Sequence, residues 1–79
     1  MSLKETIIKS LQEINSPANH RMICRYIIDN KYHDFYKSKT PEATISALLG
    51  DLIRENHPNV KRIENGKHAY LYEYIKIHD

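Results

Sequence analysis

The segment from Thr40 to Leu49, followed farther on by an Asn65-Gly66 pair, constrains the fold of this chain more than any other feature. Thr40 is a natural N-cap, and Pro41 suits the first position of a helix, where its missing N–H is not needed. Apolar residues then recur at i, i+3, i+4, i+7 and i+8, the pattern of an amphipathic helix over residues 41–55: Ile45, Leu48, Leu49, Leu52 and Ile53.

Two more helices are expected before this one. Leu3, Ile7, Ile8, Leu11 and Ile14 recur at helical spacing and predict a helix over about residues 2–14. Residues 15–17 interrupt it, residues 17–19 are expected to run briefly extended, and Asn19 can cap a second helix. We predict that this helix has a broad apolar face: Ile23, Cys24, Tyr26, Ile27 and Ile28.

The last part of the chain predicts a β-hairpin. Residues 60–63 and 68–72 have the composition of strands, and Asn-Gly within the connection 64–67 supplies the positive φ angles of a tight turn. The order is therefore α-α-α-β-β, a mainly α fold with a small hairpin wing. This is the order of a winged helix-turn-helix, and 79 residues suffice for one such domain over residues 1–79.

Composition narrows the class of protein. No apolar run exceeds four residues, so we expect no membrane span, and the first residues lack the apolar region of a secretory signal. The single Cys24 cannot form an internal disulfide, which fits the cytoplasm, or the nucleus of a eukaryote.

The charge is mildly basic, at +2, and unevenly distributed. Basic residues gather in the segment 31–40 and in the hairpin. The helix predicted between them is net acidic, with Glu42, Asp51 and Glu55 against Arg54. Most of the basic residues therefore flank this helix and do not lie on it.

The side of the 41–55 helix opposite its Ile/Leu stripe is small and smooth. It holds Ala43, Ala47, Gly50 and Arg54, with Thr44 and Ser46 beside them. Gly50 destabilises a helix interior by about 1 kcal/mol relative to Ala, so we expect a compensating contact. In this architecture the third helix usually enters a DNA groove, which makes Thr44 and Ala47 candidate contacts. The alternative is that the face packs on another protein or on an element of the same chain.

The flanking residues are candidates for phosphate binding. Lys37, Lys39 and Thr40 precede a helix N-terminus, where free N–H groups and the helix dipole favour an anion. Lys61, Arg62 and Lys67 lie on the hairpin, from which they could reach a neighbouring phosphate or the minor groove. Double-stranded DNA is therefore the expected partner.

The sequence gives little support to metal binding or catalysis. His20 and Cys24 have the spacing of two metal ligands on a helix, but no second pair of ligands completes a zinc site. The carboxylates are scattered, and no nucleophile or phosphate-loop motif is present. We expect no catalysis, no metal, no cofactor and no small-molecule substrate. Tyrosines alternate at positions 70, 72 and 74, where they could stack on bases or turn one face toward the core.

Three segments resemble the HARE-HTH domain family: the Thr-Pro-x-x-Thr-Ile-x-Ala run from Thr40 to Ala47, the stretch Pro17–Ile23, and the hairpin from Val60 to Leu71. Together with the first helix, the resemblance spans about residues 3–72. It implies a winged helix-turn-helix that brings a fused restriction, repair or chromatin activity to DNA. In the delta subunit of bacterial RNA polymerase, a related module contacts the polymerase instead.

Two hypotheses follow. The chain is a DNA-binding module that approaches the major groove through Thr44 and Ala47, or it is a protein-docking module that uses the Ala43, Ala47 and Gly50 face. The second hypothesis includes a homodimer or a polymerase-subunit role, and it gains support from the modest charge and the acidic third helix.

Overall fold

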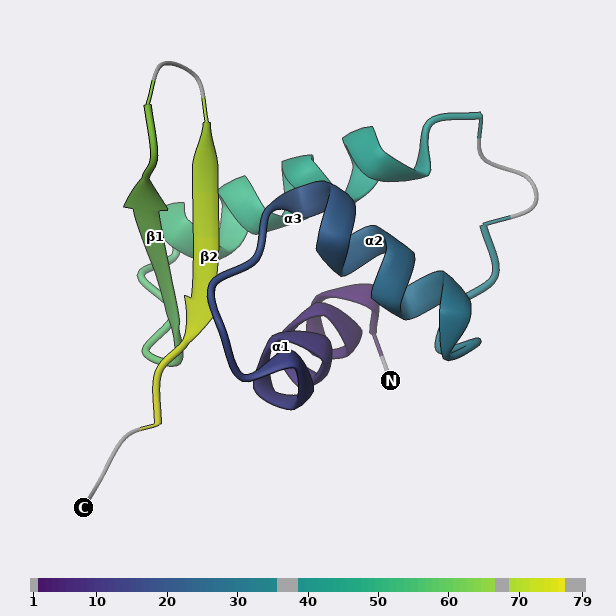
Figure 1. Cartoon of the computed structure of the whole chain (residues 1–79), viewed down its shortest axis with the longest axis horizontal. Helices are drawn as coiled ribbons and strands as arrows, with labels where there is room; N and C mark the ends of the chain where they lie inside the picture. Colours follow the sequence, from purple (N-terminus) through teal and green to yellow (C-terminus); the bar gives the residue numbers. More distant parts are fainter. Residues whose placement is uncertain (1, 36–38, 67–68, 77–79) are drawn as a thin grey trace.

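A computed structural model describes residues 2–35, 39–66 and 69–76 of the chain. Three helices precede two strands (Figure 1): α1 (Leu3–Ile14), α2 (His20–Asp29), α3 (Pro41–Arg54), β1 (Val60–Glu64) and β2 (Tyr70–Tyr74). This order confirms the predicted helix-rich fold with a β-hairpin wing. Within the described residues, no helix is both long enough and apolar enough to cross a bilayer.

Each helix begins at a recognisable cap. Ser2 and Glu5 form a capping box on α1, in which each side chain bonds to the backbone N–H of the other residue. Asn19 caps α2 by accepting from the N–H of Met22 at 2.8 Å. Thr40 is the N-cap of α3, with Pro41 in the first turn as predicted, but its side chain makes no capping hydrogen bond.

The second helix differs from the prediction on one side. Ile23, Cys24 and Ile27 are buried, and they form the core-facing stripe of α2. Ile28 was predicted to share this stripe, but its side chain is 44% exposed, so the prediction was wrong. It lies one turn after Cys24, and the helical rotation places it about 40° farther than Cys24 from the direction of Ile23 and Ile27, off the buried side.

The hairpin is antiparallel, with Arg62 opposite Tyr72 and Glu64 opposite Tyr70. Its second strand begins at Tyr70, two residues later than predicted. Within the described part of the connection only Gly66 has a positive φ, of 88°, so Asn65 does not contribute the second positive angle of a tight Asn-Gly turn.

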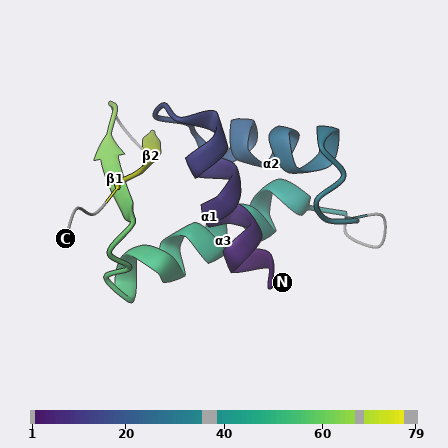
Figure 2. The same ribbon diagram turned by 90° about the horizontal axis from the view of Figure 1, so that it is seen from below.

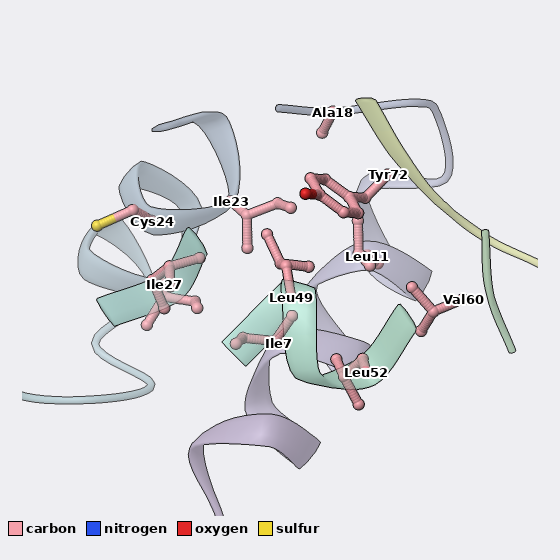
Figure 3. Close-up of a cluster of buried hydrophobic side chains, with 11 residues drawn as sticks. Ile7, Leu11, Ala18, Ile23, Cys24, Ile27, Leu49, Leu52, Val60 and Tyr72 are labelled. Atoms are coloured by element: carbon pink, nitrogen blue, oxygen red, sulfur yellow. The ribbon is translucent and has the colours of Figure 1, made fainter. Parts of the chain in front are cut away.

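One short extended segment ties the hairpin to the helices. Ala18 exchanges two backbone hydrogen bonds with Tyr72, at 2.9 and 2.8 Å, which confirms the predicted extended segment between α1 and α2. Tyr72 is only 5% exposed, and its ring enters the core among side chains from the helices (Figure 3). The core comprises Ile7, Leu11, Ala18, Ile23, Cys24, Ile27, Ile45, Leu49, Leu52, Val60 and Tyr72.

The helices form one packed group, in which each contacts the other two. Seen from below, α1 crosses α3, and α2 lies to one side (Figure 2). The hairpin rises beside the C-terminal end of α3, and β2 packs against α1 (Figure 1). The outer side of α3 therefore lies between the hairpin at one end and the segment leading into Pro41 at the other.

Candidate nucleic-acid interface

The outward side of α3 is small and open along its middle. Ala43 and Ala47 are exposed, and Gly50 is half-buried. A Cβ built on Gly50 would meet a single described neighbour, the Arg54 Nη1 atom at an ordinary contact distance of 3.4 Å. The compensating contact expected for this glycine is therefore absent from the described part of the chain. Another molecule can approach the helix backbone closely along this side.

The carboxylates of α3 and its C-cap each lie beside a basic group. Glu42 pairs with Arg21 of α2 at 3.9 Å, and Glu55 pairs with Lys4 of α1 at 2.5 Å. Asp51 pairs with Arg54 one turn along the same helix. Exposed pairs of this kind add little stability, but each places a positive charge next to a negative one. The acidic composition of this helix therefore produces a weaker negative field than its sequence suggests.

The N-terminal end of α3 carries Lys39 and Thr40, both exposed. The carbonyl of Thr40 accepts the backbone N–H of Thr44 at 3.1 Å and the Thr44 hydroxyl at 3.3 Å. Thr44 therefore donates its hydroxyl proton to its own helix, and its hydroxyl oxygen keeps lone pairs that can accept a hydrogen bond. Lys37, the third residue predicted at this end, lies outside the described residues.

On the hairpin, Arg62 lies over the ring of Tyr70, with its guanidinium carbon 4.5 Å from the ring centroid. Successive side chains of a strand point to opposite faces, so Arg62 shares a face with Val60 and Lys61 lies on the other. Burial raises the pKa of Tyr72, opposite Arg62, while the Arg62 charge acts in the other direction. Lys61 and Arg62, which were predicted to act together, thus lie on opposite faces of the hairpin. Lys67, the third residue of that group, lies outside the described residues.

The basic groups at the two ends of α3 are far apart. Lys39 precedes the first turn, and the hairpin stands beside the last turns (Figure 1). A helix of 14 residues is about 21 Å long. This length exceeds the width of the major groove of DNA, about 12 Å. Cations at both ends can therefore meet phosphates on the two sides of a groove that the helix enters.

Among the other ionisable side chains, those of Cys24 and Glu13 have roles within the fold. Within the described part of the chain, no group of three or more His, Cys, Asp or Glu side chains is placed to hold a metal ion. Cys24 is buried, and this burial raises the pKa of its thiol. Glu13 of α1 accepts hydrogen bonds from Tyr26 at 2.9 Å and Tyr32 at 2.6 Å, which tie α2 and the segment after it to the first helix.

A second surface, along α2, was not predicted from the sequence. Met22 and Ile28 are 48% and 44% exposed and line a shallow groove that runs over this helix. The signal was present in the sequence, because both residues lie on the same side of the helical wheel as the charged residues of α2.

Searches of this chain with protein-family models, against curated proteins and against solved structures found no match. The resemblance to the HARE-HTH family therefore stays a prediction, and function has to be argued from the surfaces described above.

Proposed function

We propose that the chain is a non-catalytic module that binds double-stranded DNA through α3 and the hairpin. The observation that carries the proposal is the open side of α3, on which Ala43, Ala47 and Gly50 expose the helix between two basic ends. Small side chains allow a helix to sit deep in the major groove. Glu42, Asp51 and Glu55 each pair with a lysine or arginine side chain, which reduces the repulsion of phosphates by this helix.

Each residue has a separate role in this proposal. Lys39, with Lys37 and Thr40, would hold phosphates at the N-terminal end of α3, where the helix dipole also favours an anion. Arg62, with Lys67, would hold phosphates at the hairpin. Ala47 would contact base edges and thymine methyl groups, and Thr44 would accept a hydrogen bond from a base.

Lys61 belongs to a secondary contact, because it lies on the hairpin face opposite to that of Arg62. Phosphate contacts of this kind fix register and affinity, whereas sequence preference depends on base edges. In line with the family resemblance, the module would bring a restriction, repair or transcription activity to DNA, supplied by a fused domain or by a protein partner.

Nuclear magnetic resonance can map this footprint directly. A ¹⁵N-labelled chain titrated with a short duplex should show chemical-shift changes along the Ala43–Arg54 side of α3 and at Arg62 and Tyr70. Amides of α1, which lies beneath α3, should change little. Shift changes confined to α1 or to the outer side of α2 would contradict the proposal.

Docking of another protein on the same side of α3 is the second candidate, and the open space at Gly50 favours it as much as it favours DNA. Two substitutions separate the candidates. Ala47→Glu would prevent both kinds of binding, by repelling phosphates or by blocking close approach. Ala47→Arg would block a close protein contact but would keep a charge that DNA tolerates. DNA binding that is kept in Ala47→Arg and lost in Ala47→Glu would therefore favour the DNA candidate, whereas DNA binding that is unchanged in both variants would favour the docking candidate.

A further inference from the structure

The outer edge of β1 carries backbone hydrogen-bonding groups that point away from the rest of the hairpin. β2 lies between β1 and α2 in both views of the molecule (Figure 1 and Figure 2). In an antiparallel pair, the N–H and C=O groups of successive residues point alternately to the two sides of a strand. Asn59 and Asn65, which bracket β1, bond to the backbone on the β2 side at 2.8 and 2.9 Å. The backbone groups of Arg62 and Glu64 therefore point outward, to the other side.

Within the described part of the chain, these outward groups have no hydrogen-bond partner. The corresponding groups of β2 are paired, because Tyr72 exchanges two backbone hydrogen bonds with Ala18. The start of the β1 edge is also occupied, since Val60 donates its N–H to the carbonyl of His57 at 3.3 Å. The open edge is therefore the stretch Arg62–Glu64. An unpaired edge of this kind is a template for a strand from another molecule.

An apolar pair lies at the middle of this edge, on the outward face of the hairpin. Ile63 stands directly opposite Leu71 in the register, and both side chains are half-buried. Neither is among the described side chains that form the core or pack against it. Successive residues of a strand point to opposite faces, so this pair lies on the face turned away from the buried side chains of Val60 and Tyr72. Ile63 is in position to contact a residue of an added strand.

The side chains on either side of Ile63 have opposite charges. Arg62 precedes it and Glu64 follows it, and both are exposed. We infer that the open edge of β1 pairs with the same edge of a second copy of this chain, antiparallel about a two-fold axis at Ile63. A two-fold contact uses the same patch on both subunits. Arg62 then lies opposite Glu64 of the second copy, and the two Ile63 side chains lie opposite each other.

Hydrogen bonding and charge together select this register. Outward groups must meet outward groups, so within the open stretch an antiparallel pair can have its axis at Arg62, Ile63 or Glu64. An axis at Arg62 sets two arginines opposite each other, and an axis at Glu64 sets two glutamates opposite each other. Like charges directly opposite destabilise a strand pair, whereas opposite charges stabilise it. Of the three axes, the one at Ile63 sets opposite charges against each other.

The other groups of the edge fit this arrangement. In each of the two charge pairs, the residues exchange both of their backbone hydrogen bonds. On the outward face, Leu71, Ile63 and their counterparts form one continuous apolar row. Lys61 lies opposite Asn65 of the second copy, so it meets no like charge there. The two hairpins thereby join into one sheet of four strands, with α2 of each copy beyond its outer strands.

The contact involves few residues, and small contacts bind weakly. We therefore expect a dissociation constant on the order of 100 µM, and a monomer well below this concentration. The inference does not depend on DNA binding, because it rests on the edge of β1 alone. One consequence does rest on the proposed function. Glu64 of the second copy lowers the charge that Arg62 offers to a phosphate, so the dimer opposes contact between the hairpin and DNA.

Sedimentation equilibrium of the chain without DNA tests the inference. The unmodified chain should pass from monomer to dimer between about 10 µM and 1 mM. Arg62→Glu sets two acids against each other in each charge pair, so dimerisation should weaken on the order of tenfold or more. Lys76→Glu, beyond the end of β2, changes the net charge equally and should leave dimerisation unchanged. Circular dichroism checks that both variants keep their helical content. A chain that stays monomeric up to about 1 mM, or equal weakening in the two variants, would overturn the inference.

A mixture of two variants tests the register. Glu64→Arg sets two bases against each other in each charge pair, so this variant alone should also dimerise on the order of tenfold more weakly. Mixed with Arg62→Glu, it should form a heterodimer at least as tight as the unmodified dimer, because both charge pairs are then opposite in sign. A mixture without recovery would overturn the axis at Ile63.

Amide hydrogen exchange, followed by nuclear magnetic resonance, locates the contact without any substitution. The N–H groups of Arg62 and Glu64 should exchange quickly in dilute solution and become protected as the concentration rises. Those of Lys61 and Ile63, which point toward β2, should change little. Protection gained elsewhere in the chain but not at Arg62 and Glu64 would place the contact on another surface and would overturn the proposal.

Discussion

Arg62 of β1 lies over the ring of Tyr70 of β2, with 4.5 Å between the guanidinium carbon and the ring centroid. The two residues are diagonal neighbours on one hairpin face, because Arg62 pairs with Tyr72 in the register and Tyr70 lies two residues earlier. An aromatic face attracts a cation and restricts where it points. Arg62 is thereby held on the face that the hairpin shares with the core, while its charge stays exposed.

Replacing this arginine should weaken DNA binding more than replacing its neighbour. Arg62→Gln removes a cation from the face that the hairpin turns toward the helices, and Lys61→Gln removes one from the opposite face. Both variants have the same net charge. We expect Arg62→Gln to reduce the slope of log K against log salt by about one, as loss of a phosphate contact does. Equal slopes for the two variants, measured by fluorescence anisotropy, would contradict the assignment of Arg62.

The N-terminal end of α3 can be tested by charge reversal at Lys39. Lys39→Glu places a carboxylate where the phosphate is expected, so the affinity for a duplex should fall on the order of tenfold or more. Lys76→Glu is the matched control, because it changes the net charge equally at the far end of β2. Both variants should melt at nearly the same temperature as the unmodified chain. Equal losses of affinity would show that only net charge matters and would exclude the proposed site.

Gly50→Ala separates stability from binding. The added methyl group has ordinary space, and alanine is favoured over glycine in a helix interior, so the free energy of unfolding should rise by about 0.5–1 kcal/mol. The melting temperature should rise by several degrees, about 4–8 °C per kcal/mol for a domain of this size. The affinity for DNA should fall at the same time if a partner approaches the helix here. A more stable chain with unchanged affinity would place the groove contact elsewhere on α3.

Glu13 predicts a specific pH dependence of stability. Hydrogen bonds from Tyr32 and Tyr26 hold the pKa of Glu13 below its ordinary value of 4.5. A carboxyl group with a lowered pKa stabilises the fold above its unfolded pKa, and this contribution is lost as the pH falls below about 4.5. The bond to Glu13 also raises the pKa of Tyr32 to about 12, so its stabilising effect is full below pH 10 and is lost between pH 10 and 12.

Thermal melts across this pH range check both the acidic and the alkaline loss of stability. Glu13→Gln should lower the melting temperature at neutral pH and flatten its fall at acidic and alkaline pH. Glu64→Gln, at an exposed position on the hairpin, is the control and should keep the shape of the unmodified curve. If Glu13→Gln left the profile unchanged, the Glu13 hydrogen bonds would not contribute to folding.

Local patterns were sufficient to predict the elements of the fold. Periodicity located the three helices, and Asn19 and Thr40 stand at the N-cap positions that their residue types predicted. The start of β2 was misplaced because an Asn-Gly pair suggests a two-residue turn, whereas Asn65 bonds to the carbonyl of Ala69 at 2.9 Å and only Gly66 adopts the positive φ. The register of a short hairpin depends on how its tyrosines pack on the helices, which sequence spacing does not show.

The candidate site was predictable in outline and not in detail. The small residues of α3 and the basic residues around it are visible in the sequence. The pairing of Glu42 with Arg21 and of Glu55 with Lys4 depends on how the helices cross, so no local pattern could show it. Hydrophobicity alone does not distinguish Ile28, which is exposed, from its buried neighbour Ile27.

We expect this chain to bind duplex DNA through charge as well as shape. Fluorescence anisotropy of a labelled duplex of about 20 base pairs, which exceeds the length of α3, tests it most directly when repeated at several salt concentrations. The proposal predicts micromolar or tighter binding at low salt that weakens steeply as salt rises. Absence of binding at low salt would contradict the DNA-binding account and leave the open side of α3 as a surface for another protein.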